Sequence, residues 1–252
     1  MTVTVDQLHD ITITAALDDA SPGLTGVLGI PTTPGPWPAV VVVHEIFGID
    51  EEMRKQVAHL ASLGYLALMP DLFTSGGMLR CIGATMKSLG SGKGRAYADI
   101  ESARQYLLAL DDSNGAVGVI GFCMGGGFAI MAAANGYHGG ESGFDAASVS
   151  YGIMPKDLDA IEHSCPVVAS YGGLDGTLKG AAAKLEKKYT ELGVPHDVKE
   201  YPHAGHVFMN DKLNGPALIR PLVRVMNFGP NPEAAADAWK RIDAFFGEHL
   251  RR

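Results

Sequence analysis

The sequence predicts an α/β protein in which helices flank a mostly parallel sheet, with the functional site at the carboxyl ends of the strands. Residues 39–43 (Ala-Val-Val-Val-Val) form a continuous apolar run of mostly β-branched residues, as is typical of a strand buried on both faces of a parallel sheet. Strand and helix patterns alternate after this run, which implies a parallel sheet covered by helices. Nothing in the 252 residues looks like a linker, so one domain over residues 1–252 is expected.

The first third of the chain predicts a hairpin and one strand–helix–strand unit. Residues 11–17 alternate in character and residues 24–30 follow after a Ser-Pro-Gly turn, which indicates an antiparallel hairpin at a sheet edge. Residues 51–63 carry apolar side chains at helical spacing, and residues 65–69 read as a strand that ends in Pro-Asp. Residues 72–94 are rich in glycine, so an irregular connection across the carboxyl edge of the sheet is expected there.

The rest of the chain continues the alternation. Helices are predicted at residues 96–110, 181–192 and 233–250. Strands are predicted at residues 116–120, 146–151, 166–171 and 196–201.

One cysteine lies where a predicted strand becomes a helix. The segment Gly121-Phe122-Cys123-Met124-Gly125 follows the strand at residues 116–120 and opens an apolar helix. A strand–turn–helix elbow exposes its central residue at the carboxyl end of the sheet and requires small residues two positions before and after it. The N-terminus of the helix favours a thiolate at that position. The alternative is a buried structural cysteine beside a glycine-rich turn.

A nucleophilic cysteine needs a base and a carboxylate that orients the base, and in a hydrolase elbow these follow the nucleophile in the order acid, histidine. Asp175 lies in a glycine-rich turn just after the strand at residues 166–171, and His206 lies in the loop after the final strand. Each has a plainer alternative. Asp175 is also typical of a turn former, and His203 competes with His206 for the role of base.

The loop after the valine strand, His44-Glu45-Ile46-Phe47-Gly48, supplies further candidates. In this architecture that loop donates one backbone N–H to an oxyanion hole and the residue after the nucleophile donates the other, which indicates Ile46 and Met124. Glu45 would bring a second carboxylate that accepts the thiol proton. The pair His44-Glu45 lacks the second histidine of a zinc-protease motif, so no metal is expected.

Composition narrows the class of protein. With 46% hydrophobic and 19% charged residues the chain has ample material for a core, and its net charge of −8 argues against nucleic acid or an anionic membrane as main partner. The amino terminus lacks the features of a secretory signal, so a cytoplasmic protein is expected. Cys81, Cys123 and Cys165 are expected to be reduced thiols. No cofactor is expected, and the assembly would be a monomer or homodimer.

Several motifs in order resemble those of the dienelactone hydrolase family of α/β hydrolases. They are Gly-Phe-Cys-Met-Gly-Gly, His-Glu-Ile-Phe-Gly, Pro-Asp-Leu-Phe at residues 70–73, Gly-Leu-Asp at residues 173–175 and Gly-His at residues 205–206, and the match runs from about residue 24 to the end. The resemblance implies the α/β-hydrolase fold and a triad of Cys123, Asp175 and His206, with Glu45 holding and activating the thiol. It also implies hydrolysis of ester or lactone bonds through an acyl-cysteine.

Substrate contacts follow from the same resemblance. The best-known members of the family hold the carboxylate of a dienelactone with two arginines, one after the Pro-Asp strand and one four residues past the catalytic histidine. Arg80 is the candidate for the first, but the second position is Asn210, which cannot form a bidentate ion pair with a carboxylate. Arg80, Phe47 and Asn210 are therefore the candidate substrate-binding residues. Residues 213–228 are apolar and form either a lid or a core or subunit contact, and Arg220 or Arg224 within them could replace the missing arginine.

The predicted activity is that of a carboxylic ester hydrolase acting on small esters or lactones, with carboxymethylenebutenolidase-type activity as one form of it. Two alternatives stay open. Cys123 could serve redox sensing or thiol exchange, although no C-x-x-C partner is present. The chain could also be a ligand-binding member of the fold without catalysis.

Overall fold

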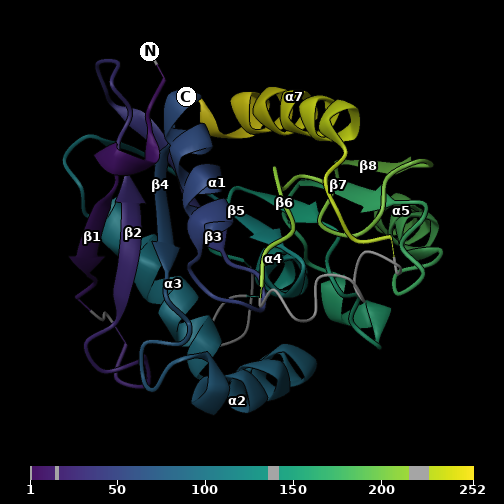
Figure 1. The fold of residues 1–252 in the computed structure, drawn as a ribbon, viewed down its shortest axis with the longest axis horizontal. Coiled ribbons are helices and arrows are strands. Elements are labelled where there is room, and N and C mark those ends of the chain that lie inside the picture. Colours follow the sequence, from purple (N-terminus) through teal and green to yellow (C-terminus); the bar gives the residue numbers. More distant parts are fainter. Residues whose placement is uncertain (1, 15–16, 136–141, 216–226) are drawn as a thin grey trace.

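The computed structural model describes residues 2–14, 17–135, 142–215 and 227–252. Its centre is an eight-stranded sheet in the order β1-β2-β4-β3-β5-β6-β7-β8 (Figure 1). The strands are β1 His9–Thr12, β2 Thr25–Gly29, β3 Trp37–Val43, β4 Leu66–Pro70, β5 Ser113–Phe122, β6 Ala146–Ser150, β7 Val167–Gly172 and β8 His196–Tyr201. The six strands from β4 to β8 in this order are parallel to one another. Strand β2 pairs antiparallel with both of its neighbours, β1 and β4. The predicted α/β class with a mostly parallel sheet is confirmed.

Helices cover both faces of the sheet. They are α1 Glu51–Ser62, α2 Met78–Ser91, α3 Arg95–Leu108, α4 Met124–Ala134, α5 Ala181–Leu192 and α7 Pro232–Leu250. The central strand β3 contributes to the core on both faces: Val41 and Val43 belong to the cluster that includes residues of α3, α4 and α5, and Val40 and Val42 to the cluster that includes residues of α1 and α7. Complete burial of each such side chain stabilises the fold by about 1.5–3 kcal/mol. Among the described residues, no helix has the length and apolar character that crossing a bilayer requires.

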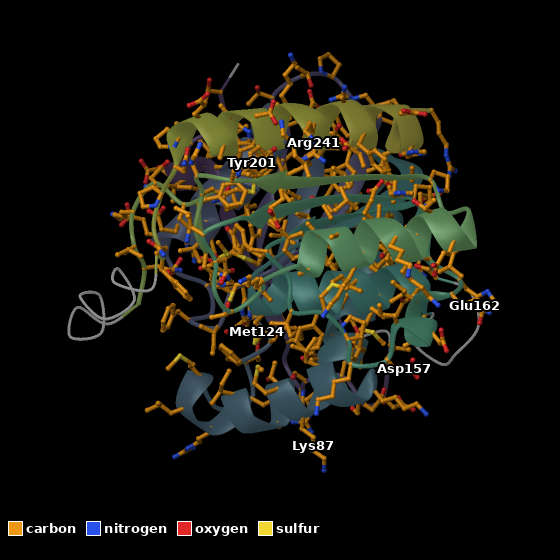
Figure 2. All side chains as sticks on the ribbon, turned by 90° about the vertical axis from the view of Figure 1, so that its right-hand side faces the viewer. Lys87, Met124, Asp157, Glu162, Tyr201 and Arg241 are labelled. Atoms are coloured by element: carbon orange, nitrogen blue, oxygen red, sulfur yellow. The ribbon has the colours of Figure 1, made fainter. Side chains whose placement is uncertain are left out.

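The closing helix α7 is tied to the sheet by one arginine. Arg241 donates from Nε to Asp197 (2.9 Å) and from Nη1 to the hydroxyls of Ser170 (3.1 Å) and Tyr201 (3.2 Å). Figure 2 shows Arg241 and Tyr201 on the α7 side of the molecule, with Lys87 of α2 at the opposite end. The half-buried guanidinium thus joins α7 to β7 and β8.

Two predicted segments differ from the structure. The first strand covers His9–Thr12, so it starts before residue 11 and ends well short of residue 17. A further bond, from Ile13 N–H to the Leu24 carbonyl (2.7 Å), extends the pairing. Residues 72–94 were expected to be irregular but contain α2, bounded by Gly77 (φ 74°) and Gly92 (φ 67°). Gly83 and Gly90 lie inside this helix. Because glycines usually indicate a loop, the sequence of residues 72–94 predicted an irregular connection instead of a helix.

Candidate active site

Cys123 lies in a sharp turn between β5 and α4. Its backbone has φ 54° and ψ −113°, a conformation that is rare for residues with a Cβ. The turn depends on neighbours without side chains, because a Cβ on Gly121 would lie 1.9 Å from the Gly125 carbonyl oxygen and a Cβ on Gly125 would lie 2.1 Å from that of Val43. The strand–turn–helix predicted around Cys123 is present, and both glycines are required by close backbone contacts.

The surroundings of Cys123 favour negative charge. Because α4 begins at Met124, the first N–H groups of the helix, which lack acceptors within it, lie close to this residue. They and the positive end of the helix dipole stabilise an anion beside the helix terminus. The Cys123 N–H donates to the Ser150 carbonyl of β6 (3.0 Å), which holds the turn against the neighbouring strand. The Cys123 side chain itself is half-buried.

Asp175 and His206 meet as a buried pair. Nδ1 of His206 lies 2.6 Å from Oδ2 of Asp175, and the two residues are 4% and 1% exposed. Asp175 follows β7, and its other oxygen accepts from the N–H (2.9 Å) and hydroxyl (2.6 Å) of Thr177. Burial alone would raise the pKa of Asp175, but the hydrogen bonds from His206 and Thr177 outweigh it and lower the pKa. The carboxylate therefore stays ionised beside the imidazole.

His206 is also fixed by its backbone and by contacts with two tilted aromatic rings. Its N–H donates to the Asn227 carbonyl (3.1 Å), and its ring lies 4.5 Å from that of Phe228 and 5.2 Å from that of Tyr151, measured between centroids. Burial opposes charge on this imidazole, but hydrogen bonds to Asp175 and Cys123 outweigh it and raise the pKa of His206 to about 10. The competing histidine, His203, is exposed.

Cys123, His206 and Glu45 line one small cavity of about 80 Å³. The other lining residues are Ile46, Phe47, Val207, Leu213, Asn214 and Phe228. The cavity therefore joins the end of β5, the loop after β3 and the loop after β8, which are far apart in the sequence.

Glu45 is held by neutral donors. It is 1% exposed, and it accepts from Nδ2 of Asn214 (2.5 Å to Oε2), from Nδ2 of Asn210 (3.3 Å to Oε2) and from the Tyr151 hydroxyl (3.4 Å to Oε1). Burial raises the pKa of Glu45 to about 7, against the lowering effects of the Asn214 hydrogen bond and the His206 charge. Its carboxyl group thus changes protonation state near neutral pH.

Two contacts of Glu45 were missed in the sequence. Tyr151 lies just past β6 with φ 42°, a strained conformation for a residue with a side chain. Its place at the carboxyl end of a strand next to β5 was a signal, since such positions face the site in this architecture. Asn214 has no comparable local signal, because nothing in the sequence relates it to Glu45.

The two candidate oxyanion donors lie in the loop after β3 and at the start of α4. Ile46 is 37% exposed and belongs to a turn closed by the hydrogen bond from Gly48 N–H to the Glu45 carbonyl (3.0 Å). Met124 is the first residue of α4, so its N–H has no acceptor within that helix. Ile46 lines the cavity, and Met124 directly follows Cys123, which also lines it.

The three candidate substrate-binding residues are not gathered at one place. Phe47 lines the cavity, and a Cβ on Gly215 would lie 2.5 Å from its ring. Asn210 is 2% exposed and directs its amide to Glu45 rather than to the cavity. Arg80 is exposed on α2 and lines a separate depression together with Arg95.

Most of the segment predicted to form a lid or a packing contact lies outside the residues that the structure describes. Of residues 213–228, residues 216–226 lie outside the described residues, and so do Arg220 and Arg224.

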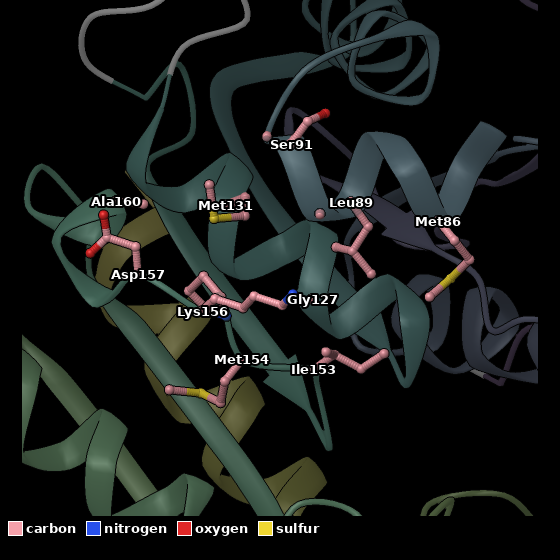
Figure 3. A pocket seen from close by; sticks show the side chains of 13 residues that line it. Met86, Leu89, Ser91, Gly127, Met131, Ile153, Met154, Lys156, Asp157 and Ala160 are labelled. Atoms are coloured by element: carbon pink, nitrogen blue, oxygen red, sulfur yellow. The ribbon is translucent and has the colours of Figure 1, made fainter. Parts of the chain in front are cut away.

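A larger hollow of about 350 Å³ lies elsewhere, between α2, α4 and residues 153–160 (Figure 3). Methionine and other apolar side chains dominate it, as Met131, Met154 and Leu89 show in the figure. Neither Cys123 nor His206 lines this hollow. We therefore place the candidate active site in the smaller cavity, where titratable groups converge.

Metal-ligand chemistry has little support in the part of the chain that the structure describes, where no three His, Cys, Asp or Glu side chains are grouped to hold an ion. The fully buried His44 uses both ring nitrogens structurally. Nδ1 bonds the Glu45 carbonyl (2.7 Å), and Nε2 accepts from Leu72 N–H (3.1 Å). Burial lowers the pKa of His44, which agrees with a neutral ring that fixes the backbone of Glu45.

Comparison with known proteins places this geometry in a family. The carboxymethylenebutenolidase of Pseudomonas putida is 30% identical over 191 residues, which cover 71% of this chain and 78% of that protein. A dienelactone hydrolase-like promiscuous phosphotriesterase from metagenomic libraries has a TM-score of 0.73 at 19% identity and covers 99% of this chain and 100% of its own. The dienelactone hydrolase of Anabaena variabilis has a TM-score of 0.69 at 19% identity, with 97% and 100% covered. These two structural similarities concern the fold alone.

A family model described as the dienelactone hydrolase family matches residues 24–250 of the sequence. This match spans most of the chain and includes every residue of the candidate site. The chain belongs to the dienelactone hydrolase family of α/β hydrolases.

Proposed function

We propose that this protein hydrolyses ester or lactone bonds of small molecules through an acyl intermediate on Cys123. The observation that carries the proposal is the buried Asp175–His206 pair, 2.6 Å apart, whose imidazole lines the same cavity as the Cys123 thiol. A nucleophile, a base and a carboxylate that orients the base are the parts that acyl transfer requires. Membership of the dienelactone hydrolase family supports a hydrolase.

Acylation begins with loss of the thiol proton. Glu45 is suited to accept it, because a base whose pKa is about 7 works best near neutral pH. The thiolate sulfur then forms a bond to the carbonyl carbon, and the carbonyl oxygen takes up negative charge. The N–H groups of Ile46 and Met124 would stabilise this oxyanion, and each such donor is typically worth about 3 kcal/mol.

Collapse of the tetrahedral intermediate breaks the bond to the leaving oxygen, which takes a proton from the His206 imidazolium. His206 is protonated at neutral pH because its pKa is about 10. In deacylation, neutral His206 removes a proton from water and becomes imidazolium again, and hydroxide attacks the thioester carbonyl. The carboxylic acid leaves as the thiolate is expelled, and the thiolate takes back the proton held by Glu45. Asp175 holds the imidazole in one orientation through both steps.

The chemistry favours activated substrates. A thioester forms readily from an aryl ester or an enol lactone, whose leaving oxygen is weakly basic, and poorly from an amide. The activity named for the Pseudomonas relative concerns such a lactone, so the hydrolysis of enol lactones belongs to the proposed range.

The test compares two cysteines of the same chain. Cys123→Ala should lower kcat/KM for an aryl ester and for an enol lactone by at least about 10³-fold, since the residue forms the covalent intermediate. Cys81→Ala, at a half-buried cysteine outside the cavity, should stay within about twofold of the parent enzyme. Full activity in Cys123→Ala would refute the proposal.

A further inference from the structure

The cavity at Cys123 lacks an arginine or lysine among its described lining residues. Five of the nine lining side chains are apolar, and the charged or polar ones are Glu45, Cys123, His206 and Asn214. His206 is the one cation in this set, and it is balanced by Asp175 at 2.6 Å and by the thiolate that forms beside it. Once these charges are paired, the carboxyl group of Glu45 leaves the cavity neutral or negative.

Asn210 cannot supply the missing positive charge. Its amide nitrogen lies 3.4 and 3.3 Å from the two oxygens of Glu45, and Nε2 of Gln56 lies 3.5 Å from its own oxygen. The side chain is 2% exposed and is therefore engaged on both sides within the protein. It stabilises the Glu45 carboxylate instead of meeting a substrate.

The surface beside the cavity is acidic. A neighbouring hollow shares Leu213 and Asn214 with the cavity. Carboxylates outnumber ammonium groups around this hollow, and each ammonium is already paired. Asp50, Glu51 and Glu52 line it with Lys212, which is bonded to Glu51 (3.0 Å). Next to these lining residues, Lys55 is bonded to Glu52 (2.9 Å) and to Asp211 (3.0 Å).

From these contacts we infer that the substrate is an ester or lactone without a free carboxylate near the bond that is cleaved. The inference rests on the proposed function and names its substrate class. An anionic acyl group would meet no unpaired cation among the described residues of the cavity and would approach past a negative surface, which slows association and weakens binding. A neutral, apolar acyl group matches Ile46, Phe47 and Phe228.

The test uses one enol lactone in two forms, with a carboxymethylene group as the free acid and as its methyl ester. The methyl ester should have a kcat/KM at least about tenfold higher at low salt and about pH 8, and the gap should narrow at high salt because screening weakens the repulsion. Equal or faster hydrolysis of the free acid would overturn the inference. If the free acid were hydrolysed faster, loss of that preference in Arg220→Ala or Arg224→Ala would assign the cation that binds its carboxylate to residues 216–226.

A pair of exposed glutamates gives a matched control. Glu51 borders the acidic hollow and lies 3.9 Å from Lys55, whereas Glu191 on α5 lies 3.7 Å from Lys187, with the same four-residue spacing. Glu51→Lys should raise kcat/KM for the free acid about two- to threefold without changing that for the methyl ester. Glu191→Lys should change neither. An equal effect of both variants would contradict the role of the acidic surface.

Alkylation separates this inference from the proposed function. Iodoacetamide and iodoacetate differ in charge but little in size, and peptide mass spectrometry assigns their rates to each cysteine. The ratio of the iodoacetamide rate to the iodoacetate rate should be higher at Cys123 than at Cys81. Cys81 serves as the reference because it lines the depression that contains Arg80 and Arg95. Failure of both lactones to turn over would refute the proposed function, while faster reaction of Cys123 with iodoacetate would refute the charge inference alone.

Discussion

The elbow at Cys123 and the helix α2 both follow parallel strands at the same edge of the sheet, yet they are held very differently. Ten of the eleven residues of α4 are buried, and the elbow's glycines lie in direct contact with backbone atoms. In α2, Thr85 is the one buried residue, and Leu79 is 86% exposed. The contrast implies that the position of the nucleophile is fixed by the backbone, whereas α2 can change with little effect on the site.

The largest effect is expected from a methyl group inside the elbow. Gly125→Ala would place its Cβ 2.1 Å from the Val43 carbonyl oxygen, in a part of the backbone with no room to move. We expect a loss of several kcal/mol in the free energy of unfolding, or failure to fold, together with loss of activity. Denaturant unfolding and ester hydrolysis would measure this. A stable, active Gly125→Ala would show that the elbow is not as rigid as the contacts indicate.

The next effect concerns the orienting carboxylate. Asp175→Asn keeps the shape of the side chain but removes a negative charge that, together with Cys123, raises the pKa of His206 to about 10. Activity should fall about 10³- to 10⁴-fold, and the alkaline limit of kcat/KM should move to lower pH, because the imidazolium loses its proton more easily. A pH–rate profile checks both. An alkaline limit left unchanged would mean that Asp175 does not act through His206.

A smaller effect is expected at Glu45. Asn214→Ala removes the donor 2.5 Å from its carboxylate, and because that hydrogen bond lowers the pKa of Glu45, the pKa should rise above about 7. The acid limit of kcat/KM should then move upward by about one pH unit or less. Glu45→Gln is the control, in which this acid limit should disappear. An acid limit that stays in Glu45→Gln would assign it to another group.

The smallest effect is expected in α2, where Gly83 has no atom within 4 Å of an added Cβ. Gly83→Ala should stabilise the protein by about 0.5–1 kcal/mol, because alanine loses less conformational freedom in a helix. Thermal unfolding measures the gain, and kcat/KM should be unchanged. Loss of activity in this variant would connect α2 to the site and remove the contrast with the elbow.

The sequence could predict those parts of the site that depend on local geometry or on chain order. The glycines flanking Cys123 are dictated by contacts within one turn, and Asp175 and His206 each follow a recognisable strand. The contacts of Glu45 with Asn210 and Asn214 had no such signal, because these residues lie 165 and 169 positions away along the chain. Tyr151 was signalled only by its place at the end of a strand next to β5. Helix α2 was missed because its glycines are typical of loops, although its exposed position tolerates them.

The acyl-cysteine mechanism is tested most directly by identifying the atom that carries the acyl group during turnover. Rapid quenching of the parent enzyme with an activated aryl ester, followed by peptide mass spectrometry, measures this. We predict one acyl group per chain, on the peptide that contains Cys123, and a longer-lived adduct in His206→Ala because deacylation needs the base. An acyl group on any other residue, or hydrolysis without an adduct in either protein, would contradict the mechanism.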